Sequence, residues 1–185
     1  MTHGKNFKRV AGTVAFLAAC ALGSAAQAAV IVNLDATDSS NGVTLNTDLS
    51  DIITITQIGT ADGGAYDAWN AWGTNAGCDN DGLCTKGWVN KWSYFVDGNS
   101  ANRTPVWDNL KYSTPGQALA NAVPVAPLTG ISSITFLIND SPYSDNEGGI
   151  SLSVDVAAVP EPGSLALLGL GLAGLGLARR RRAVR

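Results

Sequence analysis

The sequence contains very little histidine and glutamate. Among its 185 residues there is one histidine, His3, and there are two glutamates, Glu147 and Glu161. Nucleophilic hydrolases commonly pair a serine or cysteine with a histidine base, and His3 lies too close to the N-terminus to remain after removal of a leader. A glycosidase needs two carboxylates, a role that aspartates such as Asp67 or Asp108 would have to fill. The composition therefore predicts a protein that is not an enzyme.

Basic residues are also scarce in the long middle part of the chain, the body, residues 29–158. The body has 14 acidic residues against four basic ones, Lys86, Lys91, Arg103 and Lys111, which gives a net charge of −10. Proteins bind phosphate backbones through faces rich in lysine and arginine. The composition excludes nucleic acid as a partner and is compatible with divalent cations.

The body lacks a sustained helical pattern of apolar residues. Apolar and polar residues instead alternate with a period of two, as in 150–156, where isoleucine, leucine and valine occupy one face and serine and aspartate the other. β-Branched residues are frequent in several similar segments. The segments that we predict to be strands are 30–34, 52–58, 87–97, 106–112, 131–138 and 150–156.

Turn signals of the Asn-Gly, Asp-Gly and Gly-Gly types separate these segments. The body is long enough for one domain with its own core. We therefore predict an all-β protein whose body is a single antiparallel β-sandwich of the jelly-roll type. The stretch 118–128, which contains Pro124 and Pro127, is expected to be a surface connection.

The first 28 residues have the three parts of a secretory signal peptide. Basic residues precede an apolar stretch, and Ala26-Gln27-Ala28 offers a small-x-small site for signal peptidase. The mature chain is expected to begin at Ala29. An alternative is that Leu17-Ala18-Ala19-Cys20, which resembles a lipobox, directs a lipid onto Cys20.

The C-terminal region, residues 159–185, contains an apolar run from 165 to 178 that ends at four arginines. As a helix this run would be about 21 Å long, which is shorter than the hydrocarbon core of a bilayer, about 30 Å. The run therefore predicts a short, marginal membrane span. The arginines favour a cytoplasmic end and an exported body. They are Arg179, Arg180, Arg181 and Arg182.

Pro160, Glu161 and Pro162 precede this apolar run and the arginine cluster. Three such parts in this order at a C-terminus resemble the PEP-CTERM sorting signal of Gram-negative bacteria that make exopolysaccharide. The resemblance implies recognition by an exosortase, a membrane-embedded cysteine protease of the transpeptidase type, which removes the span and delivers the body to the cell surface or extracellular matrix. An ordinary membrane anchor is the alternative.

Two cysteines, Cys78 and Cys84, remain in the body. In an exported protein they predict a disulfide that closes a small loop. A metal site would need more cysteine or histidine ligands. Asp79-Asn80-Asp81-Gly82, between the cysteines, is only a weak match to a calcium loop, since the other ligands of that motif are absent.

The five tryptophans of the chain lie between residues 69 and 107. Tryptophan suits both a core and a sugar-stacking surface because it joins a large apolar ring to a polar N–H. We expect Trp88 and Trp92 to be core residues. We expect Trp69 and Trp72, in a segment rich in glycine and asparagine, to be exposed and to bind carbohydrate.

The segment from Asn139 to Gly148 gathers three carboxylates and several side-chain amides before the last predicted strand. Such oxygen ligands suit Ca²⁺. The segment resembles the calcium loop of galactose-specific bacterial lectins with jelly-roll folds, which implies Asp140, Asp145 and Asn146 as ligands, Gly148 as the turn, and the Tyr143 carbonyl as a further ligand. This loop is two residues shorter than in that family. A simple turn between two strands is the alternative.

These observations leave two classes of function open. One is a non-catalytic module that binds extracellular polysaccharide, to which Trp69, Trp72 and the Asp140 segment would contribute. The other is a structural protein of the matrix or biofilm that has no ligand. The acidic surface and the lack of a complete site favour this second class.

Overall fold

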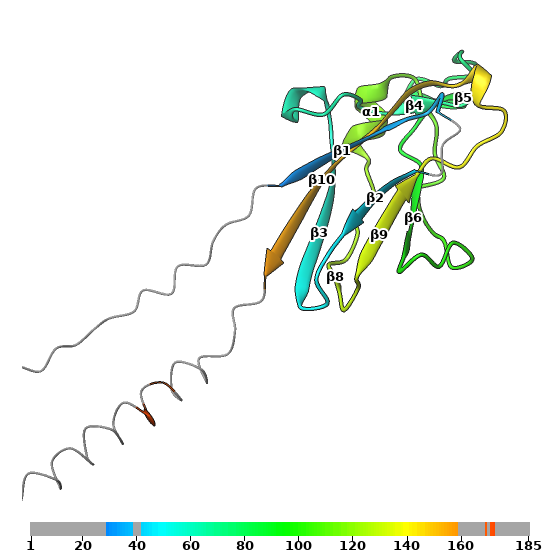
Figure 1. Cartoon of the computed structure of the whole chain (residues 1–185). Helices are drawn as coiled ribbons and strands as arrows, with labels where there is room; N and C mark the ends of the chain where they lie inside the picture. The colour runs from blue at the N-terminus through cyan, green and yellow to red at the C-terminus, as the bar shows by residue number, and fades with distance from the viewer. Residues whose placement is uncertain (1–28, 39–41, 159–168, 170, 173–185) are drawn as a thin grey trace, which may run out of the picture.

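The structure is a computed structural model that describes residues 29–38, 42–158, 169, 171 and 172 (Figure 1). The predicted signal peptide, the Cys20 lipobox, the Pro-Glu-Pro segment and the arginine cluster all lie outside these residues. So does the predicted span, apart from Gly169, Gly171 and Leu172. Within the part of the chain that the structure describes, no helix has the length and apolar character needed to cross a membrane.

The body consists of strands that form two antiparallel sheets, which confirms the predicted all-β class. In chain order its elements are β1 (Val30–Asp35), β2 (Val43–Asn46), β3 (Asp51–Ile58), the 3-10 turn η1 (Thr60–Asp62), β4 (Trp69–Asn70), β5 (Leu83–Val89), β6 (Trp92–Val96), β7 (Thr104–Val106), α1 (Pro115–Ala120), β8 (Leu128–Thr129), β9 (Ser133–Leu137), the 3-10 turn η2 (Tyr143–Asp145) and β10 (Glu147–Ala158).

The long last strand, β10, organises the first sheet. Its first two residues pair with β4, residues 149–154 pair with β1, and residues 151–158 pair with β3. Strand β3 in turn pairs with the short strand β8, and β4 pairs with β5. The second sheet has the strand order β2-β9-β6-β7.

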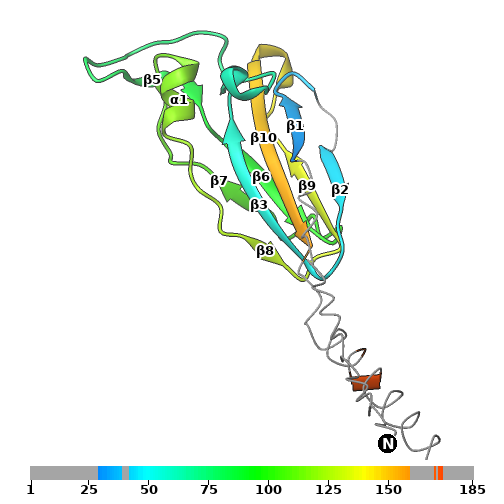
Figure 2. The same cartoon turned by 90° about the vertical axis from the view of Figure 1, so that its left-hand side faces the viewer.

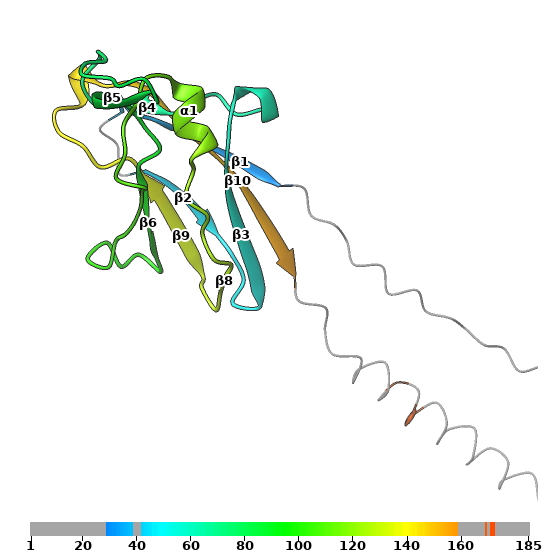
Figure 3. The same ribbon diagram turned by 180° about the vertical axis from the view of Figure 1, so that it is seen from behind.

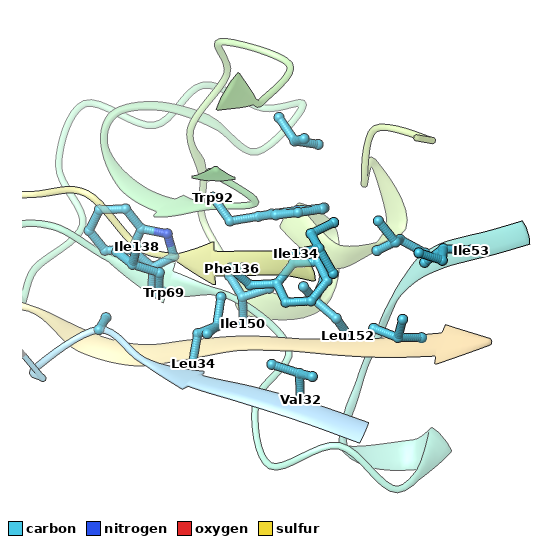
Figure 4. Packing of buried hydrophobic residues seen from close by; sticks show 14 of the residues in the cluster. Val32, Leu34, Ile53, Trp69, Trp92, Ile134, Phe136, Ile138, Ile150 and Leu152 are labelled. Carbon is cyan, nitrogen blue, oxygen red and sulfur yellow. The ribbon is translucent and has the colours of Figure 1, made fainter. Parts of the chain in front are cut away.

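The core lies between the two sheets (Figure 4). Alternate residues of β10, Ile150, Leu152 and Val154, are fully buried, as the period-2 pattern predicts. They meet Ile134 and Phe136 of β9, which are also fully buried and belong to the same cluster. Strands β1, β3, β6 and β7 contribute further aliphatic and aromatic side chains, so that one core joins both sheets.

The predicted strand 87–97 is wrong as a single element, because the chain leaves one sheet and enters the other within it. Asn90, between β5 and β6, is completely buried. Its side-chain amide donates hydrogen bonds to the carbonyl oxygens of Ala118 (3.2 Å) and Asn121 (2.7 Å). These hydrogen bonds to residues far along the chain set the position at which β5 ends and β6 begins. An alternation pattern within the segment 87–97 cannot reveal them.

The predicted strand 106–112 is also largely wrong, since β7 ends at Val106. Beyond it the Asp108 carboxylate accepts the backbone N–H of Leu110 at 2.9 Å, and Asn109 has a φ of 66°. This local hydrogen bond favours a turn over a strand. The predicted surface connection, 118–128, begins inside the helix α1 and ends at β8.

Both ends of the body leave from one end of the domain. Val30, the first residue of β1, pairs with Val154 near the end of β10. The opposite end carries β4, β5, α1 and the loop that leads into β10, and Figures 2 and 3 show it directed away from the end of β10. A tether at the C-terminus would therefore leave this distal end free to meet other molecules.

Candidate functional site

The Asp140 loop, residues 139–146, connects β9 to β10 at the distal end. Within it the backbone N–H of Asn146 donates to the carbonyl oxygen of Tyr143 at 3.3 Å, which closes the 3-10 turn η2. Asp145 is exposed and Asp140 is partly exposed. Gly148 follows with a φ of 80°, a conformation that glycine adopts without strain. Gly148 lies within β10 and pairs with Trp69, so it is a strand residue with a positive φ and not the predicted turn before the strand.

Asn146 is engaged in the interior of the domain and is only 8% exposed. Its side-chain amide donates to the carbonyl oxygen of Ala36 at 2.8 Å, so that it ties the loop to the end of β1. Its amide oxygen is buried and accepts no hydrogen bond from the described residues. Asn146 is thus a structural residue in this conformation, which was not expected from the sequence.

Calcium binding by Asp140, Tyr143, Asp145 and Asn146 stays a prediction. Among the described residues, no group of three or more histidine, cysteine, aspartate or glutamate side chains could hold a metal ion. The Tyr143 carbonyl already accepts the N–H of Asn146, and the Asn146 amide faces Ala36. Two of the expected ligand residues therefore already make hydrogen bonds within the protein in this conformation.

The expectation that Trp69 is exposed is wrong. Its side chain is 1% exposed and lies in the core between the sheets (Figure 4). Its indole N–H donates to the carbonyl oxygen of Lys91 at 2.6 Å, which satisfies the polar group that burial would otherwise leave without a partner. No face of this ring is open to a sugar in the structure described here.

Trp72 is partly exposed, and the turn that presents it is built by Asn70. The completely buried Asn70 side chain accepts the N–H of Trp72 at 3.0 Å and donates to the Thr74 carbonyl at 3.3 Å. The ammonium of Lys111 lies 5.4 Å from the centre of the Trp72 ring, which is within cation–π range. The backbone and the side chain of Trp72 are therefore both held in place.

The structure brings the Trp72 turn and the Asp140 loop together. Strand β4, which precedes Trp72, pairs with the start of β10, which follows the loop. Beside Trp72, a Cβ built on Gly73 would lie 3.2 Å from the carbonyl oxygen of Asp145. These two segments are about 70 residues apart in the sequence. Their proximity forms the candidate site at the distal end.

The disulfide between Cys78 and Cys84 is confirmed. It closes a loop in the connection from β4 to β5, beyond the Trp72 turn. Inside this loop the Asp79 carboxylate accepts the N–H groups of Asp81 (3.0 Å) and Leu83 (2.9 Å). Asp79 thus stabilises a local turn, which accounts for the resemblance of this segment to an acidic ligand loop.

Trp92 is a core residue, as predicted, and is 1% exposed. Trp88 is partly buried against Ala68, Tyr112 and Ala118 in a smaller cluster. This second cluster packs α1 and the loop after β7 against β5. Both tryptophans named as core residues therefore pack inside, although Trp88 does so less completely.

The two aspartates considered as glycosidase carboxylates have structural partners. One oxygen of Asp67 accepts the N–H of Thr60 at 2.6 Å and its hydroxyl at 3.0 Å. Asp108 accepts hydrogen bonds from Asn90, Leu110 and the Tyr112 hydroxyl. Burial, followed by this hydrogen bond and the negative charge of Asp108, raises the pKa of Tyr112 well above its ordinary value.

Sequence reasoning missed Trp107 as a surface aromatic residue. It is partly exposed, and the ammonium of Lys91 lies 5.1 Å from the centre of its ring. Two of the four basic residues of the body thus lie on tryptophan rings. In the sequence Lys91 stands beside Trp92, and Lys111 lies four residues after Trp107, but in the fold Lys91 contacts Trp107 and Lys111 contacts Trp72.

Comparison with known protein families places this chain among exported proteins that are sorted at the membrane. Residues 158–182 match the model of the PEP-CTERM protein-sorting motif, which confirms the resemblance seen in the sequence. The motif marks a protein that an exosortase processes on its way to the cell surface. No curated protein and no solved structure matches the chain, so the likeness to galactose-specific lectins is not confirmed.

Proposed function

We propose that the exported body is a non-catalytic module that binds extracellular polysaccharide. The observation that carries the proposal is the placement of Trp72, a partly exposed indole on a braced turn beside the Asp140 loop. Rigid aromatic faces bordered by polar groups are suited to sugar rings, which have apolar faces and hydroxyl rims. The site lies at the end of the domain opposite the last residues of β10, after which the sorting motif follows in the sequence, and this position suits a protein held or released at a cell surface.

The strand order supports a jelly-roll sandwich as the scaffold. The chain crosses repeatedly between two sheets. One contains the strands in the order β1-β10-β3-β8, and the other contains them in the order β2-β9-β6-β7. Strands β1, β3, β8 and β10 lie in one sheet, and β2, β6, β7 and β9 lie in the other. This alternation is that of two Greek keys wrapped into a double sheet. The arrangement gathers several inter-strand loops at the distal end, where the site lies.

The same proposal includes calcium as a ligand of the Asp140 loop. Asp140 and Asp145 supply hard carboxylate oxygens in a body with a net charge of −10, and the backbone of Asp145 lies beside the Trp72 turn. A bound cation would reduce the repulsion among these acidic groups. Bound there, it would lie at the edge of the aromatic surface.

A glycan array with and without calcium tests the proposed function. The mature protein should bind at least one class of polysaccharide, and Trp72→Ala should abolish that binding. Trp72→Phe keeps an aromatic face and should retain part of it. Since Trp72 also packs against the core, the melting temperature of each variant has to be compared with that of the wild type.

The alternative is a structural matrix protein that has no polysaccharide ligand. The large acidic excess of the body is the observation that favours it, because such a surface keeps a protein soluble and monomeric without any ligand. No binding by the folded wild type to any polysaccharide, with or without calcium, would establish this alternative and overturn the proposal.

A further inference from the structure

A groove at one edge of the domain lies between β7 and the extended segment 123–126. It has a volume of about 230 Å³ and is lined by both apolar and polar groups, among them Tyr94, Thr104, Trp107 and Pro124. Strand β7 is the last strand of its sheet, so that this side of the groove carries no further strand. The volume is below the roughly 300–1,000 Å³ of sites for drug-sized ligands and is suited to a smaller unit.

The aromatic wall of the groove is held in place by several contacts. The Trp107 indole N–H donates to the Leu110 carbonyl at 3.3 Å. Tyr94 packs against the buried ring of Trp92, with ring centres 6.0 Å apart. Flat, fixed aromatic surfaces lose little conformational entropy on binding, and this favours recognition of a rigid ring.

Lys91 is not one of the residues that line the groove, but it places a positive charge beside the groove through its contact with Trp107. Its backbone is anchored, since its carbonyl oxygen accepts the N–H of the buried Trp69 and its neighbour Trp92 is completely buried. Its ammonium lies 5.1 Å from the Trp107 ring centre.

The same arrangement occurs at Trp72, where the ammonium of Lys111 lies over the ring. One loop, residues 107–111, supplies Trp107 at its start and Lys111 at its end, and the exposed Leu110 lies between them. The two indole and ammonium pairs are therefore joined by a single short loop. Two aromatic positions joined in this way would suit a polymer better than a single sugar.

We infer that the groove at Trp107 and Lys91 binds an acidic sugar of the uronic acid type, as one unit of a polysaccharide that also reaches Trp72. The ring of the sugar stacks on the aromatic wall, and its carboxylate pairs with the lysine ammonium. Two cations on two aromatic surfaces, in a body that otherwise repels anions, supply the charge complementarity. This inference rests on the proposed polysaccharide binding and adds the class of sugar.

Affinity electrophoresis of the mature protein in gels with polygalacturonate or its fully methyl-esterified form tests the inference. The ester has the same sugar rings without the charge. The wild type should bind the acid form about tenfold more tightly, which corresponds to one good charge contact. Lys91→Gln should lose about that factor on the acid and change little on the ester.

Lys86→Gln is the matched control, because Lys86 is exposed on β5 and the substitution removes the same charge. It should bind as the wild type does. Equal losses in the Lys86 and Lys91 variants, or equal binding of the acid and the ester by the wild type, would overturn the inference. In the latter case Lys91 only covers the Trp107 ring.

Trp107→Ala separates this inference from the proposed function. It should weaken binding to polygalacturonate, and its melting temperature shows whether the fold is intact. If Trp72→Ala abolishes binding and Trp107→Ala has no effect, the groove is not a sugar site and the proposed function stands. If the folded wild type binds no polysaccharide, both fail, and if it binds extended peptides alone, the groove is a peptide site and the inference is wrong.

Discussion

The indole N–H of Trp69 donates a 2.6 Å hydrogen bond to the carbonyl oxygen of Lys91, whose own ammonium lies over the ring of Trp107. A core tryptophan therefore positions a surface cation. Trp69 belongs to the structural framework of the candidate surface and is not part of the surface itself.

Substitution of Trp69 should therefore reduce stability before it affects binding. Trp69→Ala should lower the free energy of unfolding by about 3–5 kcal/mol, the usual cost of deleting a large buried ring. Trp69→Phe keeps most of the packing and leaves the Lys91 carbonyl without its donor, at a cost of about 1–3 kcal/mol. Urea unfolding measures both values. Two variants as stable as the wild type would contradict the burial of Trp69.

Asn146 and Asp140 should respond differently to calcium. Asn146→Ala removes the hydrogen bond to Ala36 and should lower the melting temperature even when calcium is absent. Asp140→Asn should leave the fold intact and remove any rise in melting temperature that millimolar calcium gives the wild type.

The expected size of that calcium effect follows from binding to the folded state alone. At a calcium concentration one hundred times Kd the stabilisation is about 2.7 kcal/mol. Magnesium should give much less, because it requires a tighter octahedral shell. If the wild type and Asp140→Asn melt alike throughout a calcium titration, the Asp140 loop is only a turn.

Asp97 should make the stability depend on pH in the acid range. The backbone N–H of Ser132 and its hydroxyl donate to one Asp97 oxygen at 2.7 and 2.8 Å, and these bonds hold the pKa of the carboxyl below its ordinary value. The stabilisation is therefore complete above the unfolded pKa of about 4 and is lost as the pH falls through the lower folded pKa.

Thermal melting between about pH 5 and pH 2 checks this dependence, since that range begins above the unfolded pKa of an aspartate and extends well below it. Asp97→Asn cannot titrate and should show a smaller fall in melting temperature than the wild type. Ser132→Ala removes one donor and should give an intermediate slope. The same acid slope in all three proteins would show that the Asp97 contact does not contribute.

The sorting motif predicts that the mature protein lacks its C-terminal region. Because residues 158–182 form the motif, exosortase processing should remove Arg179 to Arg182 together with the apolar run. Intact mass spectrometry of the protein recovered from the producing cell measures this directly. A cell-surface species that retains the arginines would contradict processing, and incorporation of labelled palmitate at Cys20 would support the lipoprotein alternative.

The sequence predicted the parts of the fold that depend on local pattern. Strands β1, β3, β9 and β10 were found because their alternation reflects one buried face, and the disulfide was found from the spacing of two cysteines in an exported chain. The break at Asn90 was missed, since its acceptors come from the region of α1. Helix α1, with Thr114 as its N-cap, is too short for a periodic pattern.

The candidate site was predictable only in part. Trp72 and the Asp140 loop were both named from composition, and the pairing of β4 with β10 brings them together. Trp69, in the same segment and of the same residue type, is in the core, because it belongs to β4, which pairs with β5 on one side and β10 on the other. Trp72 lies beyond the end of β4. The contacts of Lys91 and Lys111 with the tryptophans depend on packing between elements, which a single sequence does not encode in its spacing.

The most direct test of the proposed function is co-sedimentation of the mature protein with the extracellular polysaccharide of the producing cell. The wild type should appear in the polysaccharide pellet, and a Trp72→Ala variant with an unchanged melting temperature should remain in the supernatant. A wild-type protein that is folded, correctly processed and yet remains entirely in the supernatant, at every calcium concentration, would contradict polysaccharide binding.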